Sequence, residues 1–213
     1  NDCTASALFY DPMLASQADY LASAVPTLEL LVRTPLLGES FAGPEVPGRP
    51  SYGVFLQGGE SSETINLDVG GEDVVMLMYT SGTTGRPKGV MLTHENCFFQ
   101  SVNGWALGIS PEVISLVVLP LFHVGGLNGS VTPILHAGGT VILVPKFDPA
   151  DVLRLVEEHK AHGIMAVPTV YQMLLEHPDF KTRNLKSLQV LISGGAPLPE
   201  ALMRTFHGMG FEM

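Results

Sequence analysis

The groups in this chain best suited to binding phosphate follow directly on an apolar run at residues 74–79. Glycines there let backbone N–H groups approach an anion closely, and successive N–H groups in turn conformations form an anion-binding concavity. Hydroxyl groups add further donors, and a lysine adds a point charge. We therefore predict a phosphate-binding loop formed by Thr80, Ser81, Gly82, Thr83, Thr84, Gly85 and Lys88.

The spacing within this loop separates it from two common phosphate motifs. A Walker A loop ends in Gly-Lys followed by Ser or Thr, whereas Lys88 stands between Pro87 and Gly89. The dinucleotide-binding pattern G-x-G-x-x-G does not fit the stretch either. A plain surface loop between two periodic segments would explain the glycines, but it leaves the density of hydroxyl groups beside one lysine unexplained.

Two further loops carry candidate site residues. Pro120-Leu-Phe-His123-Val-Gly-Gly126 follows an apolar strand and presents a single histidine. A lone histidine of this kind is commonly a hydrogen-bonded structural residue. The two glycines after it are compatible with packing or with room left for a ligand. Ser193-Gly-Gly-Ala-Pro197 is typical of a tight turn from a strand into a helix.

Apolar segments of strand length alternate with helical segments along the chain, and the strands are apolar on both faces. This pattern indicates an α/β fold with a largely parallel sheet flanked by helices. Ligands bind outside the carboxyl ends of such strands, so we expect the three loops at one sheet edge. Strands are predicted at residues 7–10, 28–32, 74–79, 115–119, 140–144, 164–167 and 188–193, and helices at 13–24, 93–102, 125–137, 148–160, 169–175 and 199–206.

The run Ser81-Gly-Thr-Thr-Gly-Arg-Pro-Lys-Gly89 resembles the signature Ser-Gly-Thr-Thr-Gly-x-Pro-Lys-Gly of the adenylate-forming (AMP-binding) superfamily at every fixed position. The resemblance implies that the loop holds the β- and γ-phosphates of ATP and that Lys88 and His123 have catalytic roles. It also implies two sets of ligand contacts. These are His123, Gly125 and Gly126 beside the acyl substrate, and Gly194, Gly195, Ala196 and Pro197 beside the adenine.

The activity implied by the resemblance is that of an acyl-CoA synthetase of the long-chain fatty-acid–CoA ligase type. Such an enzyme activates a carboxylic acid with ATP and Mg²⁺ to an acyl-adenylate, and then transfers the acyl group to CoA. Leu121-Phe-His-Val124 stands where peptide-synthetase domains carry Phe-Asp-x-Ser, which favours a CoA ligase. A fatty acid is the expected substrate. An aryl acid, luciferase-like oxygenation and a non-catalytic nucleotide-binding or interaction module remain as alternatives.

The charge and the cysteine content limit the binding partners and the cellular compartment that we expect for the protein. Residues 1–73 contain eleven acidic and two basic residues (net −9), and residues 74–213 contain ten and nine (net −1). The sequence has no stripe of basic residues that could bind the phosphate backbone of a nucleic acid, so we expect small-molecule partners. Peripheral membrane contact through a lipid substrate and homo-oligomerisation are further expectations. Cys3 and Cys97 form no disulfide framework and no signal peptide is recognisable, which favours the cytoplasm.

The resemblance covers the chain well from about residue 74 to its end and faintly before it. We therefore divide the chain into an acidic N-terminal part, residues 1–73, and a nucleotide- and acyl-binding subdomain, residues 74–213. Superfamily members continue into a Tyr-Gly-x-Thr-Glu motif whose glutamate holds magnesium, a Thr-Gly-Asp segment and a C-terminal domain with a catalytic lysine. We expect this chain to be an incomplete part of the large N-terminal domain, to hold no metal by itself and to be inactive alone.

Overall fold

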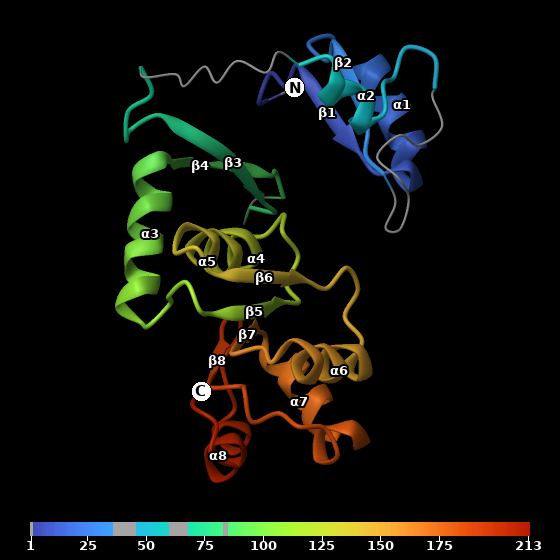
Figure 1. Cartoon of the computed structure of the whole chain (residues 1–213). Helices are drawn as coiled ribbons and strands as arrows, with labels where there is room; N and C mark the ends of the chain where they lie inside the picture. The colour runs from blue at the N-terminus through green and yellow to red at the C-terminus, as the bar shows by residue number, and fades with distance from the viewer. Residues whose placement is uncertain (1, 36–45, 60–67, 83–84) are drawn as a thin grey trace. The chain divides into compact units, whose positions relative to one another are not determined.

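The computed structural model describes residues 2–35, 46–59, 68–82 and 85–213. The chain divides into two compact units, residues 1–68 and 69–213, which are described separately (Figure 1). The Gly- and Pro-rich stretch at residues 38–50 lies largely outside the described residues. Of the described helices, none is both long and apolar enough to cross a membrane.

The first unit is a small parallel βαβ arrangement. Strand β1 (Ala7–Tyr10) pairs in parallel with β2 (Leu30–Arg33), and a 3-10 turn (Pro12–Leu14) followed by α1 (Ala15–Ala24) connects them. The Asp11 side chain caps this connection by accepting the backbone N–H of Met13 at 2.8 Å. A short helix, α2 (Tyr52–Gln57), follows. The first two predicted strands and the helix between them are confirmed, with boundaries shifted by up to two residues.

The second unit begins with an antiparallel hairpin of β3 (Val74–Thr80) and β4 (Lys88–Thr93). These two strands form a sheet of their own. The prediction that residues 74–79 form a buried strand of the parallel sheet is therefore wrong. Six of the large apolar side chains on the hairpin are 40% to 66% exposed, namely Val74, Val75, Leu77, Tyr79, Val90 and Met91.

The predicted parallel sheet is confirmed for the remainder of the second unit. Its strand order is β6-β5-β7-β8, and all three pairings are parallel. The two central strands are largely buried, as their lack of alternation indicated, whereas the edge strands are partly exposed, with Leu143 52%, Val190 42% and Ile192 40% exposed. The strands are β5 (Ile114–Val117), β6 (Thr140–Leu143), β7 (Gly163–Ala166) and β8 (Val190–Ser193).

Two helices of this unit begin at side-chain caps. Thr93 and Asn96 form a reciprocal capping box at the start of α3, and Asp148 accepts two backbone N–H groups at the start of α6. Helix α3 packs against α5 and crosses it at a large angle (Figure 1). The helices are α3 (His94–Ala106), α4 (Val124–Gly126), a π-helical turn (Leu127–Val131), α5 (Thr132–His136), α6 (Pro149–His159), α7 (Pro168–Glu176), a 3-10 turn (Pro178–Lys181) and α8 (Glu200–Gly208).

The main core lies between the parallel sheet and α6, α7 and α8. Tyr171 on α7 is almost fully buried, and its hydroxyl lies 2.7 Å from the carbonyl oxygen of Ile164 and 2.9 Å from that of Ile192. Because Ile164 lies on β7 and Ile192 on β8, this hydroxyl ties the helix to both strands. Burial raises the pKa of Tyr171 well above its ordinary range, so the hydroxyl remains a donor.

A polar contact between α6 and the segment before β8 gives the fold a pH dependence. Glu157 accepts the backbone N–H of Asn184 at 2.8 Å and a guanidinium N–H of Arg183 at 3.1 Å. These two contacts, the first being the larger, lower the pKa of Glu157. A carboxylate with a depressed folded-state pKa stabilises the fold above its unfolded pKa, about 4.3, and loses that contribution as the pH falls through its folded pKa.

We expect Glu157→Gln to lower the free energy of unfolding at pH 7 and to have little effect at a pH below both pKa values. Urea denaturation of both proteins at pH 7 and near pH 3 measures this difference. Glu158→Gln is the matched control, because Glu158 pairs with Arg154 on its own helix. An equal loss from Glu157→Gln at the two pH values would contradict the assignment.

Candidate functional site

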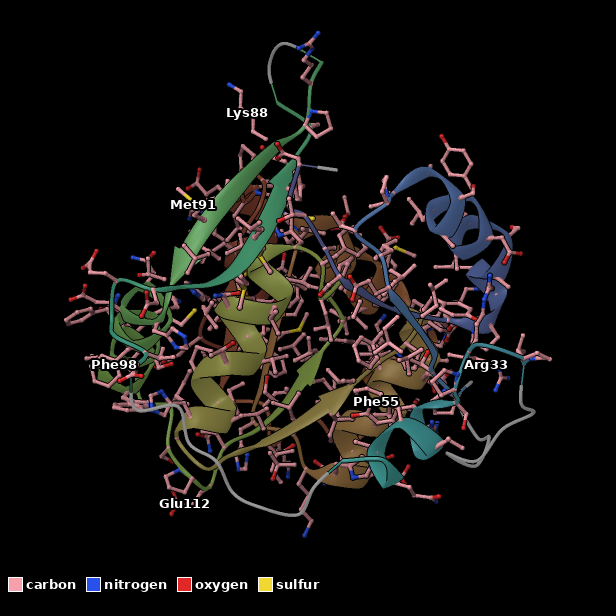
Figure 2. The ribbon with its side chains drawn as sticks, turned by 90° about the horizontal axis from the view of Figure 1, so that it is seen from above. Arg33, Phe55, Lys88, Met91, Phe98 and Glu112 are labelled. Atoms are coloured by element: carbon pink, nitrogen blue, oxygen red, sulfur yellow. The ribbon has the colours of Figure 1, made fainter. Side chains whose placement is uncertain are left out.

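The predicted phosphate loop is the tip of the β3–β4 hairpin. Thr80, the last residue of β3, pairs with Lys88, the first residue of β4. Both side chains are exposed, and Figure 2 shows Lys88 at the free end of the hairpin. Thr83 and Thr84 lie outside the described residues. Lys88 is thus the first residue of a strand, a position that holds its backbone while leaving its ammonium group free to meet an anion.

Two glycines give the hairpin tip its backbone path. Gly82 has a φ of +64° and Gly85 a φ of +79°, both in the left-handed region that favours glycine. A Cβ atom on Gly82 would lie only 2.2 Å from the carbonyl oxygen of Arg86. Gly82 is therefore required by the close approach of the two sides of the loop, whatever ligand the loop binds.

His123 caps the short helix α4 at the second predicted loop. Its Nδ1 accepts the backbone N–H of Gly125 at 3.1 Å. The neutral imidazole must then carry its proton on Nε2, because Nδ1 is the acceptor. The side chain is exposed, so Nε2–H is available as a donor to a ligand. The structure supports a structural role for one ring nitrogen and leaves the other for the predicted role beside the acyl substrate.

Gly126 is explained by backbone packing. A Cβ atom on this residue would lie 2.2 Å from the carbonyl oxygen of Pro120, and that oxygen belongs to the backbone and cannot swing aside. At Gly125 the nearest atom to such a Cβ would be Nδ1 of His123, at 3.3 Å. The missing side chain of Gly126 thus closes the turn that holds His123. The acyl-contact role assigned to Gly125 and Gly126 stays a prediction.

The third predicted loop follows β8 and begins beside β7. The backbone N–H of Gly194 donates to the carbonyl oxygen of Ala166 at 3.2 Å, and Gly195 has a φ of +77°. Ala196 and Pro197 are exposed. The Ser193 hydroxyl is buried and has no hydrogen-bond partner among the described residues. The loop thus has the small, open surface that the predicted adenine contact requires.

Met165, near the carboxyl end of β7, links the second and third loops and was missed by the sequence analysis. Its methyl group lies 3.3 Å from the position of a Cβ atom on Gly129 and 3.6 Å from that of one on Gly194. The Ser130 hydroxyl lies 3.3 Å from the Met165 sulfur and 2.9 Å from the carbonyl oxygen of Gly125. The thioether therefore contacts Ser130 in the helical segment after His123, and its methyl group lies on the side of Gly194 where a side chain would project.

The structure thus brings two of the three predicted loops to one edge. The loops containing His123 and Gly194 follow β5 and β8, which flank β7 on either side, at the carboxyl ends of parallel strands. The prediction that the Thr80–Lys88 loop shares this sheet edge is wrong, because β3 pairs only with β4 within the described residues. No group of three or more His, Cys, Asp or Glu side chains is placed to hold a metal ion in the part of the chain that the structure describes.

Comparison with protein-family models decides the family. The model of the AMP-binding enzyme matches residues 1–212. This chain belongs to the AMP-binding enzyme family. The resemblance seen at Ser81–Gly89 therefore extends over both units, including the acidic N-terminal part where the sequence analysis found only a faint likeness.

The relatives of this AMP-binding chain include CoA ligases for different acids. It is 44% identical over 149 residues to a feruloyl-CoA synthase of an Amycolatopsis species, covering 70% of this chain and 30% of that protein. It is 34% identical over 213 residues to the indoleacetate–CoA ligase of Aromatoleum aromaticum, which covers 100% of this chain and 40% of that protein. A long-chain-fatty-acid–CoA ligase of Bacillus subtilis is 36% identical over 138 residues, covering 63% and 25%.

Solved structures of similar proteins show the same fold. ATP-bound MatB from Rhodopseudomonas palustris superposes with a TM-score of 0.76 at 30% identity, covering 97% of this chain and 38% of that one. The anthranilate CoA ligase AuaEII, solved with anthranoyl-AMP, has a TM-score of 0.86 at 24% identity, covering 99% and 40%, a likeness that bears on fold alone. The chain spans 25–40% of the length of the three curated relatives above.

Proposed function

We propose that the whole protein to which this AMP-binding chain belongs is an AMP-forming acid–CoA ligase. The observation that carries the proposal is the hairpin tip, where glycine-dependent backbone turns and the exposed Lys88 coincide with the family's signature. A carboxylate oxygen attacks the α-phosphorus of ATP, the bond to the bridging oxygen breaks, and pyrophosphate leaves. The CoA thiol then attacks the acyl carbon and AMP leaves.

The first step requires charge neutralisation and positioning more than covalent help. The backbone N–H groups and hydroxyls at the tip, with Lys88, would bind the β- and γ-phosphates and stabilise the negative charge that accumulates on the leaving pyrophosphate. Mg²⁺ would enter on the ATP phosphates and keep much of its water shell. In the superfamily that this chain resembles, the glutamate that holds magnesium belongs to the Tyr-Gly-x-Thr-Glu motif, which lies outside these 213 residues.

At the edge of the parallel sheet, the Nε2–H group of His123 would donate to the substrate carboxylate. The turn at Gly194–Pro197 would receive the adenine against its small side chains. Met165 contacts Ser130 and faces the open side of Gly194, so it would form a wall shared by the acyl and nucleotide subsites. We propose that the isolated chain is inactive, because the steps above draw on the magnesium ligand and the C-terminal lysine of the superfamily, which lie outside these 213 residues.

Two classes of acid are candidates. The Leu121-Phe-His-Val-Gly-Gly-Leu127 sequence supports a fatty acid, as does the likeness to the Bacillus subtilis ligase. An aryl acid is supported by the higher identity to the feruloyl-CoA synthase and by the match of the indoleacetate–CoA ligase to the entire chain. The thioether of Met165 favours the aryl class physically, because sulfur makes favourable contacts with aromatic rings.

An acid panel tests the proposal and separates the two classes. The whole protein is incubated with ATP, Mg²⁺, hydroxylamine and one acid at a time, namely ferulate, indoleacetate, anthranilate, decanoate or palmitate. We expect acyl-hydroxamate from one class at a rate at least about tenfold above the other, since a well-fitted apolar pocket discriminates by roughly 1–3 kcal/mol. The ligase proposal would be refuted if none of the carboxylic acids tested gave hydroxamate above the acid-free background.

A further inference from the structure

A π-helical turn follows the histidine loop and joins α4 to α5. It spans Leu127–Val131, and the backbone N–H of Thr132 donates to the carbonyl oxygen of Leu127, five residues earlier. The Ser130 hydroxyl repeats this spacing by donating to the carbonyl oxygen of Gly125 at 2.9 Å. Turns of this kind are rare and occur frequently at functional sites. The π-turn directly after the histidine loop therefore calls for an explanation.

Asn128 carries a buried amide in this π-turn. The residue is only 5% exposed, its Nδ2–H donates to Sγ of Cys97 at 3.3 Å, and its Oδ1 has no hydrogen-bond partner among the described residues. A sulfur atom is a weak acceptor, and a buried oxygen without a partner costs free energy. A leucine has the same branched skeleton without polar atoms and would avoid this cost. The stability of the fold therefore does not account for an asparagine at this position.

The partner of the amide, Cys97, belongs to the helix that follows the phosphate hairpin. Helix α3 begins at the Thr93–Asn96 capping box, where β4 ends, and Cys97 lies on its first turn. Strand β4 in turn begins at Lys88. The amide–sulfur contact thus joins two parts of the second unit that the proposed reaction uses, namely the phosphate hairpin and the histidine loop.

We propose that Asn128 is a positioning residue for the adenylation step. Its amide holds the π-turn against α3 and so keeps the His123 imidazole in register with the phosphates bound at the hairpin. The carboxylate and the α-phosphorus react only when closely aligned, and a misplacement of about 1 Å can lower a rate by roughly 10²-fold. Asn128 acts through His123 and Lys88 rather than on the reacting atoms. The inference rests on the proposed function and adds to it a residue outside the three predicted loops.

Single-turnover release of pyrophosphate by the whole protein, with ATP and the preferred acid at saturation, tests the inference. We expect Asn128→Leu to lower the rate at least about tenfold, as for a misaligned reaction. Its Tm is expected to equal or exceed that of wild type, because the unpartnered buried oxygen is gone. Asn103→Leu is the matched control, since it makes the same change at an exposed position of α3, and it is expected to leave the rate unchanged.

Variants of Cys97 test the contact itself. Cys97→Ser keeps an acceptor for the amide and is expected to retain most of the wild-type rate, whereas Cys97→Ala removes the acceptor and is expected to lower the rate as Asn128→Leu does. Combining Cys97→Ala with Asn128→Leu is expected to cost no more than the larger single loss, because both changes break one contact. If Asn128→Leu does not fold, Cys97→Ala compared with Cys97→Ser decides the question.

Three results would overturn the role of Asn128: equal rates for wild type and Asn128→Leu, additive losses in the double variant, or losses that follow a fall in Tm across the variants. Failure of the proposed function has a different signature, because wild type itself would then release no acid-dependent pyrophosphate with any acid tested.

Discussion

Lys88→Ala is expected to lower the rate of acyl-adenylate formation by the whole protein by about 10²–10³-fold, the typical effect of removing one preorganised group that stabilises transition-state charge. Lys88 is the first residue of β4, opposite Thr80 in the hairpin register. The antiparallel pairing fixes its backbone, while its side chain is exposed at the free end of the hairpin (Figure 2). Its ammonium group can therefore meet the leaving phosphates without first giving up an ion pair within the described chain.

Acid-dependent release of pyrophosphate in single-turnover experiments measures this effect on the adenylation step. Lys88→Arg keeps the charge and is expected to retain part of the activity. Lys186→Ala, which removes an exposed lysine from the loop before β8, is the matched control and is expected to behave as wild type. Equal adenylation rates for wild type and Lys88→Ala would remove Lys88 from the mechanism, whatever the effect on KM.

Gly126→Ala is expected to destabilise the fold by about 1–3 kcal/mol, the usual range for forcing an extra carbon into a packed site. The new Cβ would sit 2.2 Å from the carbonyl oxygen of Pro120, 2.8 Å from its carbonyl carbon and 2.9 Å from the carbonyl oxygen of Leu119. All three are backbone atoms, so the turn from β5 into α4 must open. Because His123 caps α4 through Gly125, the same shift would displace the imidazole and lower activity as well.

Thermal unfolding measures the effect, and a loss of this size corresponds to a Tm decrease of roughly 2–12 °C for a chain of this length. Gly208→Ala is the control, since a Cβ at this position on α8 meets nothing within 4 Å and alanine there is expected to be neutral or slightly stabilising. Gly125→Ala should be tolerated better than Gly126→Ala. A Tm for Gly126→Ala equal to that of wild type would show that the turn is not held by this close contact.

Local sequence signals predicted most of the fold because their physical causes are local. The Asp148-Pro149 start of α6 places an N-cap acceptor before a residue with no N–H to satisfy, and the structure forms the helix there. The apolar segments that became β5, β7 and β8 lacked alternation, which correctly indicated a parallel sheet flanked by helices, although Val190 and Ile192 on β8 are 42% and 40% exposed.

The pairing of β3 could not be predicted in the same way. An apolar run shows that a segment forms a strand, but its partner and direction depend on residues elsewhere. Here the partner was Lys88–Thr93, which the sequence analysis treated as part of the loop and the approach to the next helix. The signal available was the alternation of Val90 and Leu92 with Gly89, Met91 and Thr93, which is weak because Met91 is itself apolar.

The candidate site, like the fold, was predicted only in part. The roles of His123 and the Gly194–Pro197 turn were predicted from the resemblance to the superfamily, and the sheet topology brings their loops to one edge. Met165 has no polar group and looked like any strand residue, so its contacts with Ser130 and Gly194 emerged only in three dimensions.

Identifying the nucleotide that the whole protein releases from ATP tests the central claim most directly. The whole protein, supplied with ATP, Mg²⁺, CoA and the preferred acid, is expected to form AMP and pyrophosphate in a 1:1 ratio with acyl-CoA, because the carboxylate attacks the α-phosphorus. Without the acid, no AMP above background is expected. Formation of ADP and phosphate in place of AMP, or AMP formation that does not depend on the acid, would contradict the account.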